Sequence, residues 1–187
     1  MSENIALAEV SDAAKLEKQY VFLPPVWQSV DHVIIRATEI SLFVVGLLFA
    51  FMVTLEVVSR YVFNFSIFFV DGAAKLLLLW FFLLGAGLAL RYGAHVGFEL
   101  LLRALPPRRR KALILTSQAL ALVFFLEMVW GGYFALGPAS RQSEPSLEVS
   151  MFWAFLAIPV GFVLLAYHMI VLMFIEVRRA PGDGAPS

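Results

Sequence analysis

Three histidines, inside or beside long apolar stretches, could carry chemistry in this sequence. Two imidazoles on adjacent membrane helices can ligate haem iron. The histidines are His32, His95 and His168, and their places along the apolar stretches do not put them at one obvious depth. We therefore do not expect a haem or metal site. His95 should be a polar residue of a surface helix, and His168 should hydrogen-bond between helices.

Two acids inside the apolar stretches are the better candidates, because a carboxylate in hydrocarbon is costly and tends to be paired, protonated or placed in a polar cavity. Glu56 is followed one helical turn later by Arg60, which predicts an ion pair on the helix surface. Glu127 has no basic residue within a turn. It should pair with Lys75 or Arg60 from a neighbouring span, or with a partner subunit; a proton or ion path through it is the alternative.

Other classes of chemistry have no signature here. The chain has no cysteine, which excludes disulfides, a thiol nucleophile and cysteine-bound metal centres. It also lacks a Gly-rich phosphate loop and a nucleophile elbow, so we predict no enzyme and no cofactor. Fourteen basic residues balance fourteen acidic ones, so the basic field that nucleic-acid binding needs is missing.

The elements that position these residues are four long stretches of low charge. Hydrophobic residues make up 61% of the chain and charged residues 15%, against roughly 45–50% and 25% in soluble domains. Each stretch can cross about 30 Å of hydrocarbon as a helix. We predict an all-α membrane protein with a cytoplasmic segment at 1–32 and a membrane domain at 33–176. Its spans should lie at about 33–58, 72–90, 112–136 and 149–175.

The basic residues indicate an orientation, because Lys and Arg beside spans are retained in the cytoplasm. Eleven lie on the side of the two termini and the loop between the second and third spans, and three lie on the other side. Both termini should therefore be cytoplasmic. In that loop, residues 95–107 predict a short interfacial helix, since His95, Glu99 and Arg103 repeat every four residues. Residues 177–187 should be a disordered tail.

Small residues four apart occur in every span and permit close helix approach. The pairs are Gly46 and Ala50, Gly85 and Ala89, Ser117 and Ala121, and Ala157 and Gly161. Pro159 removes one helical hydrogen bond and should kink the fourth span.

Three stretches carry a family resemblance. The first span ends with RYVFNFS at 60–66, the second holds LWFFLLGAGLALRYGAHVGFE from 79 to 99, and the fourth holds AIPVGFVLL at 157–165. In the same order and on the same spans, they resemble the small membrane subunit of tripartite ATP-independent periplasmic (TRAP) transporters, the DctQ-like family. The candidate structural or subunit-interface residues in these stretches are Arg60, Asn64, Trp80, Gly85, Arg91, Gly93, His95, Pro159 and Gly161.

The start of the second span departs from the family pattern. Where the family usually has a Trp, two Glu and an Arg, this chain has Phe69, Asp71, Gly72 and Lys75. Asp71 and Lys75, both candidates, are four residues apart, where a helical ion pair can form. A second pairing is open, because the short outer loop could bring Arg60 to Asp71 and fix the first span against the second.

The resemblance implies a noncatalytic small permease subunit of the bacterial inner membrane. It would scaffold a large, DctM-like membrane subunit and work with a periplasmic solute-binding protein in ion-gradient-driven uptake. Sodium coupling would then lie in the large subunit. Two other functions stay open: a membrane anchor of a redox complex, and a small proton-coupled exporter that uses Glu127 or Glu56. The solute itself is not encoded in any motif of this chain.

Overall fold

Four long helices make up most of the described structure. The computed structural model of the protein describes residues 21, 23–65, 67–92 and 106–178. Each helix is long and apolar enough to cross a membrane, and in the described ranges only an isolated bridge between Ser143 and Ser150 has β geometry. The predicted all-α membrane fold with four spans is confirmed. The helices are α2 (Pro25–Val62), α3 (Phe68–Arg91), α5 (Pro107–Ser140) and α6 (Phe152–Arg178).

Local chemistry explains where the helices begin. α2 and α5 start at Pro25 and Pro107, because proline lacks an N–H that the first helical turn would leave unused and its φ suits a helix. Both helices therefore start before the predicted spans, at 33 and 112. α6 starts at Phe152 and not at 149, with its first helical hydrogen bond from the Phe155 N–H to the Met151 carbonyl. Just before the helix, the Ser150 hydroxyl accepts a hydrogen bond from the Phe152 N–H at 3.2 Å.

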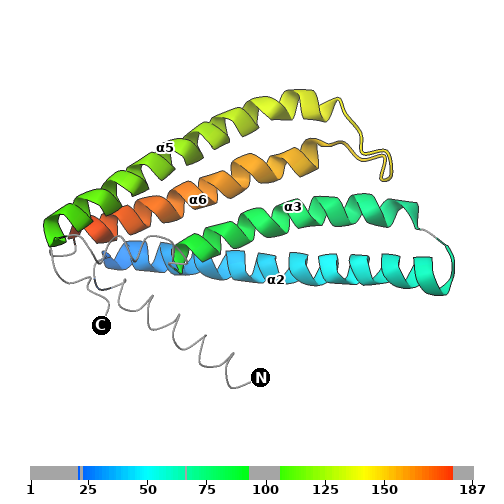
Figure 1. The fold of residues 1–187 in the computed structure, drawn as a ribbon, viewed down its shortest axis with the longest axis horizontal. Helices are drawn as coiled ribbons and strands as arrows, with labels where there is room; N and C mark the ends of the chain where they lie inside the picture. Colours follow the sequence, from blue (N-terminus) through cyan, green and yellow to red (C-terminus); the bar gives the residue numbers. More distant parts are fainter. Residues whose placement is uncertain (1–20, 22, 66, 93–105, 179–187) are drawn as a thin grey trace, which may run out of the picture.

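The helices lie side by side in one layer (Figure 1). Their order across the layer is α5, α6, α3, α2, and the extensive helix contacts join only these neighbours. They draw together where α2 begins and α6 ends, which we call the converging end, and spread apart toward the splayed end. A single layer has two broad faces, so little of the chain is shielded on both sides.

Glycines set the closest helix crossings. A Cβ added at Gly161 on α6 would lie 2.6 Å from the Cβ of Leu83 on α3, and one at Gly132 on α5 would lie 3.0 Å from Pro159 on α6. The spacing of small residues indicated that Gly161 permits close helix approach, whereas Gly132 was missed. At Gly85 an added Cβ would meet a Leu42 methyl of α2 at 3.7 Å, which is an ordinary van der Waals contact. The kink at Pro159 stays a prediction.

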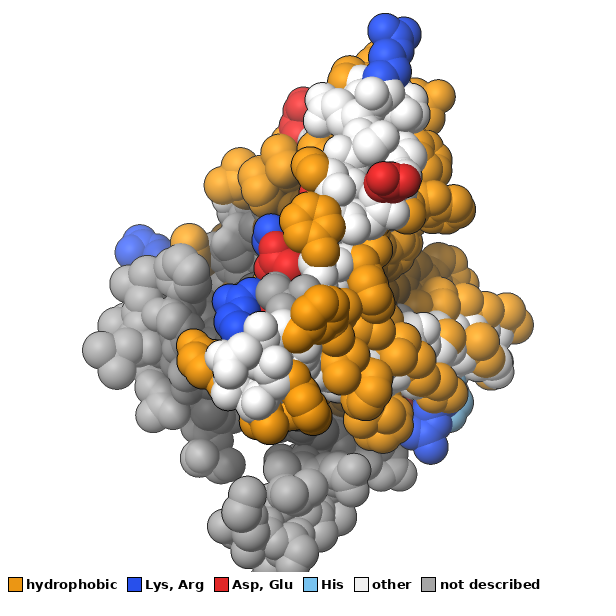
Figure 2. Space-filling view, turned by 90° about the vertical axis from the view of Figure 1, so that its right-hand side faces the viewer, with side chains coloured by type: hydrophobic (Ala, Val, Ile, Leu, Met, Phe, Trp, Pro, Cys, Tyr) orange, Lys and Arg blue, Asp and Glu red, His pale blue; other side chains and the backbone are white. Residues whose placement is uncertain are grey.

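Apolar side chains face outward over much of the molecule. Figure 2, which looks onto the splayed end, shows mostly hydrophobic side chains on the visible surface and few charged ones. The most apolar windows of α2 and α5 hold no buried residue, whereas 44% of the corresponding window of α6 is buried. α2 and α5 form the edges of the layer, so their outward faces require lipid or a partner protein as their surroundings.

Several predictions from the sequence fall outside the described residues. These are the interfacial helix at 95–107 over its first eleven residues, the candidates Gly93 and His95, and the disordered tail from 179 onward. They stay predictions.

Candidate functional site

A buried ion pair lies at the converging end. The guanidinium Nη2 of Arg91, the last residue of α3, lies 2.7 Å from Oδ2 of Asp31 on α2. The two side chains are 0% and 1% exposed. Each charge is buried away from water and is compensated by the other, because an uncompensated buried charge is strongly destabilising. The pair therefore fixes α2 against α3, which gives the candidate Arg91 a structural role.

Sequence reasoning missed Asp31, because residues before 33 were assigned to the cytoplasmic segment. A helical signal was available: Asp31, Ile35 and Thr38 are spaced as one helix face, and all three are buried. Asp31 also stands near the start of one span while Arg91 ends the next. In antiparallel neighbours these two positions meet at the same depth.

His168 of α6 joins this region. It is completely buried and close enough to Asp31 and Arg91 to interact electrostatically with both. Neither ring nitrogen has a hydrogen-bond partner in the described part of the chain, so the predicted interhelical hydrogen bond is wrong. His168 instead packs as a core side chain beside Gly87 of α3, where an added Cβ would lie 3.7 Å from its ring and 2.9 Å from Leu164.

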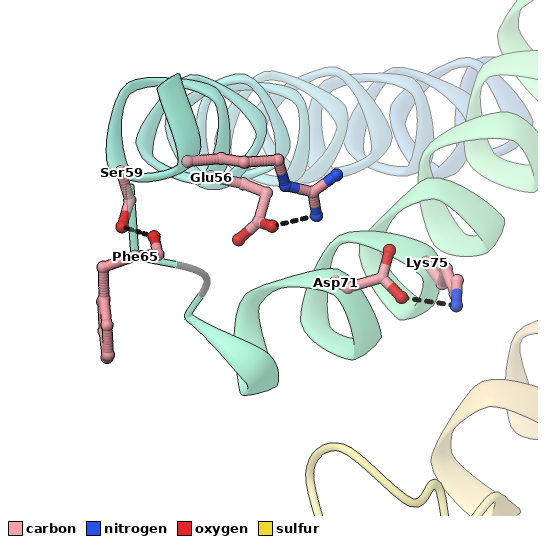
Figure 3. A network of polar contacts seen from close by, with 6 residues as sticks. Glu56, Ser59, Phe65, Asp71 and Lys75 are labelled. Carbon is pink, nitrogen blue, oxygen red and sulfur yellow. Dashed lines mark hydrogen bonds and ion pairs between the residues drawn. The ribbon is translucent and has the colours of Figure 1, made fainter. Parts of the chain in front are cut away.

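The loop after α2 explains part of the RYVFNFS stretch (Figure 3). Asn64 has a φ of 50°, a left-handed conformation that asparagine tolerates better than most residues. The chain then turns back, so that the Phe65 N–H donates to the Ser59 carbonyl at 3.1 Å. The Ser59 hydroxyl donates to the Phe65 carbonyl at 2.5 Å. Asn64 is therefore a turn residue that closes the end of α2.

Two separate ion pairs flank this loop. Arg60 pairs with Glu56 within α2, and Lys75 pairs with Asp71 within α3 at 2.6 Å (Figure 3). Both local pairings were predicted from their spacing and are confirmed. The alternative ion pair between Arg60 and Asp71 is wrong, because each side chain reaches its own neighbour one turn away without ordering the loop between the helices.

Polar contacts also tie α6 to its neighbours. The Trp80 indole of α3 donates to the Trp153 carbonyl of α6 at 3.1 Å. At the converging end, the Lys111 ammonium of α5 donates to the Val177 carbonyl near the end of α6 at 2.9 Å. A cation at a helix C-terminus is favourable because the last carbonyls lack helical partners. These contacts give Trp80 a structural role.

Glu127 differs from these residues. It is exposed on α5, and in the described part of the chain it has neither an ion pair nor a hydrogen bond. The predicted pairing with Lys75 or Arg60 is wrong, since those cations bind Asp71 and Glu56. No group of three His, Asp or Glu side chains in the described ranges is arranged to hold a metal ion.

Comparison with known proteins defines the class of the molecule. Residues 32–179 match the family described as the DctQ component of tripartite ATP-independent periplasmic transporters. The chain therefore belongs to the DctQ family, whose members are transporter components and not enzymes. It is a small membrane subunit of the TRAP type and a multi-pass protein of the bacterial inner membrane.

Individual relatives agree with this class. The ectoine TRAP transporter small permease protein TeaB of Halomonas elongata is 28% identical over 83% of this chain and 82% of its own length. The C4-dicarboxylate TRAP transporter small permease protein DctQ of Rhodobacter capsulatus is 33% identical over 53% of this chain and 44% of its own length. The sialic acid TRAP transporter permease protein SiaT of Haemophilus influenzae is 27% identical over 66% of this chain but only 20% of its own length.

Proposed function

We propose that this chain scaffolds the large membrane subunit of a TRAP transporter and does not itself bind the transported solute. The observation that carries the proposal is that polar side chains of this chain join its own helices to one another. Asp31, Arg91 and Trp80 hold helices to one another. No metal-binding cluster exists in the described ranges, and the two faces of the layer remain available for a neighbour in the bilayer.

The comparison with SiaT supports a large partner. This chain corresponds to one fifth of that permease protein, so most of that protein has no counterpart here. We infer that the remaining functions of a permease are supplied to this chain by a separate large subunit. The solute site and the coupling-ion site, expected to be for sodium, would lie in that subunit, and a periplasmic binding protein would deliver the solute.

Co-purification tests the scaffold. An affinity-tagged form of this chain, expressed with the large subunit of its own system and extracted in mild detergent, should recover the large subunit in near-equal amount. The buried apolar surface of a stable membrane complex keeps it together in detergent micelles. Recovery no better than that from cells with an unrelated tagged four-span protein would contradict the scaffold proposal.

Topology gives an independent prediction. Fusions of a fluorescent reporter after Pro107 and after Arg178 should be active in the cytoplasm, and a phosphatase fusion after Gln142 should be active in the periplasm. The reason is the split of eleven basic residues against three. Cytoplasmic activity of a reporter placed at Gln142 would overturn the proposed orientation.

A further inference from the structure

The outer face of α5 combines large apolar side chains with one acid. Leu120, Phe124, Trp130 and Phe134 are between 52% and 72% exposed. Glu127 lies among them at helical spacing, and Gly131 beside it has no atom within 4 Å of an added Cβ. We call these six residues the Glu127 face. Most of it points away from α6, which packs on the other side of α5 through residues such as Leu122 and Phe125. Phe124 lies at the border of the face, where its ring meets Phe162 of α6 edge to face at 6.1 Å between ring centroids.

The depth of Glu127 makes lipid an unsuitable neighbour. Within the predicted span at 112–136 it lies about 22 Å from the first residue and about 14 Å from the last, at about 1.5 Å per residue. A glutamate side chain is too short to cover either distance. Acids at such depth face a protein interior or a polar cavity, because hydrocarbon solvates a carboxylate poorly.

Nothing in the described part of this chain supplies that environment. α5 is an edge of the layer, and its extensive contacts are with α6 alone. A second copy of the chain in parallel register would place one Glu127 against another, which is unfavourable for two carboxylates. The neighbour must therefore be a different chain, and charge complementarity asks for a basic side chain on it.

We propose that the Glu127 face docks a transmembrane helix of the large permease subunit, and that this helix presents a Lys or Arg to Glu127. The inference rests on the proposed function, and it specifies which face binds. A shallow apolar groove of about 510 Å³, lined by Ser117, Leu120, Ala121, Val123 and Phe124, continues the face toward the start of α5. Gly131 permits close approach of a helix backbone.

Photo-crosslinking tests the face directly. A photoreactive phenylalanine derivative can replace one Phe of the chain at a time. Phe124 on α5 and Phe51 on α2 form a matched pair, at 52% and 59% exposed on opposite edges of the layer. In membranes with the full transporter, the probe at 124 should give an adduct with the large subunit and the probe at 51 should not. Adducts only between copies of this chain, only with lipid, or equally from both positions would overturn the proposal.

Substitution of the acid gives a second measurement. Glu127→Leu should lower recovery of the large subunit at least about tenfold, because the basic partner would remain buried without its counter-ion. Glu127→Gln should lose less, since an amide still accepts a hydrogen bond. The thermal midpoint of the isolated chain should not fall in either variant. If the wild-type chain and Glu127→Leu recovered the large subunit in equal amounts, the docking face would be refuted and the scaffold proposal would stand. If the wild-type chain itself failed to recover the large subunit, the scaffold proposal would be refuted.

Discussion

Replacing Arg91 by alanine should destabilise the isolated subunit by about 3 to 5 kcal/mol, the range seen when one partner of a buried ion pair is removed. Asp31 would then be a charge at 1% exposure without its counter-ion. The measurement is the thermal unfolding midpoint in one fixed detergent, followed together with size-exclusion behaviour. We expect a clear fall in the midpoint and loss of the monodisperse peak, because α2 and α3 would separate at the converging end.

Two further variants separate pairing from general damage. Lys75→Ala removes a cation from an exposed ion pair and should cost at most about 1 kcal/mol. Asp31→Ala combined with Arg91→Ala should cost less than the sum of the single losses, because each single variant leaves one buried charge without its counter-ion and the double variant leaves none. Equal midpoints for Arg91→Ala and Lys75→Ala, or strictly additive losses in the double variant, would refute the role assigned to the buried pair.

Gly161→Leu should prevent stable packing of α3 on α6. The position of the added Cβ, 2.6 Å from Leu83 Cβ, is closer than real Cβ contacts, so one helix must move. Overpacking alone costs about 1 to 3 kcal/mol. A displaced α6 would also lose the Trp80 to Trp153 hydrogen bond. We expect aggregation or a strongly lowered unfolding midpoint for the purified chain.

Gly131→Leu is the matched control for this substitution. It makes the same chemical change in a neighbouring span, at a position where an added Cβ has no atom within 4 Å. The isolated chain should keep its unfolding midpoint or gain slightly, since leucine favours helix over glycine by roughly 1 kcal/mol. If the two leucine variants unfolded at the same temperature, the crossing at Gly161 would not be what holds α3 to α6.

What could be predicted from the sequence was decided by local physics. Long apolar stretches identify four membrane helices, because hydrocarbon offers no hydrogen bonds to the backbone N–H and C=O groups and a helix pairs these groups within the span. The pairs Glu56 with Arg60 and Asp71 with Lys75 follow from spacing alone, since side chains four residues apart meet on any helix. For the same reason the more distant pairing of Arg60 with Asp71 was wrong.

Contacts between distant segments were harder to predict. Asp31 and Arg91 are 60 residues apart, and their pairing depends on which helices are neighbours in the layer and on α2 starting at Pro25. The order of α5, α6, α3 and α2 across the layer likewise cannot be predicted from the sequence of any single span. It decides that Gly161 and Gly132 lie at the closest contacts of α6 with its two neighbours, whereas an added Cβ at Gly85 would make only an ordinary contact with Leu42 of α2.

The most direct test of the central claim, that this chain scaffolds and does not select solute, is an exchange of subunits in proteoliposomes. Vesicles containing the large subunit, with the binding protein and an ion gradient supplied, should take up solute only when a small subunit is present. Exchanging this chain for a close DctQ relative that still assembles should leave the range of transported solutes unchanged. A solute range that follows the small subunit, or uptake by this chain alone, would contradict the account.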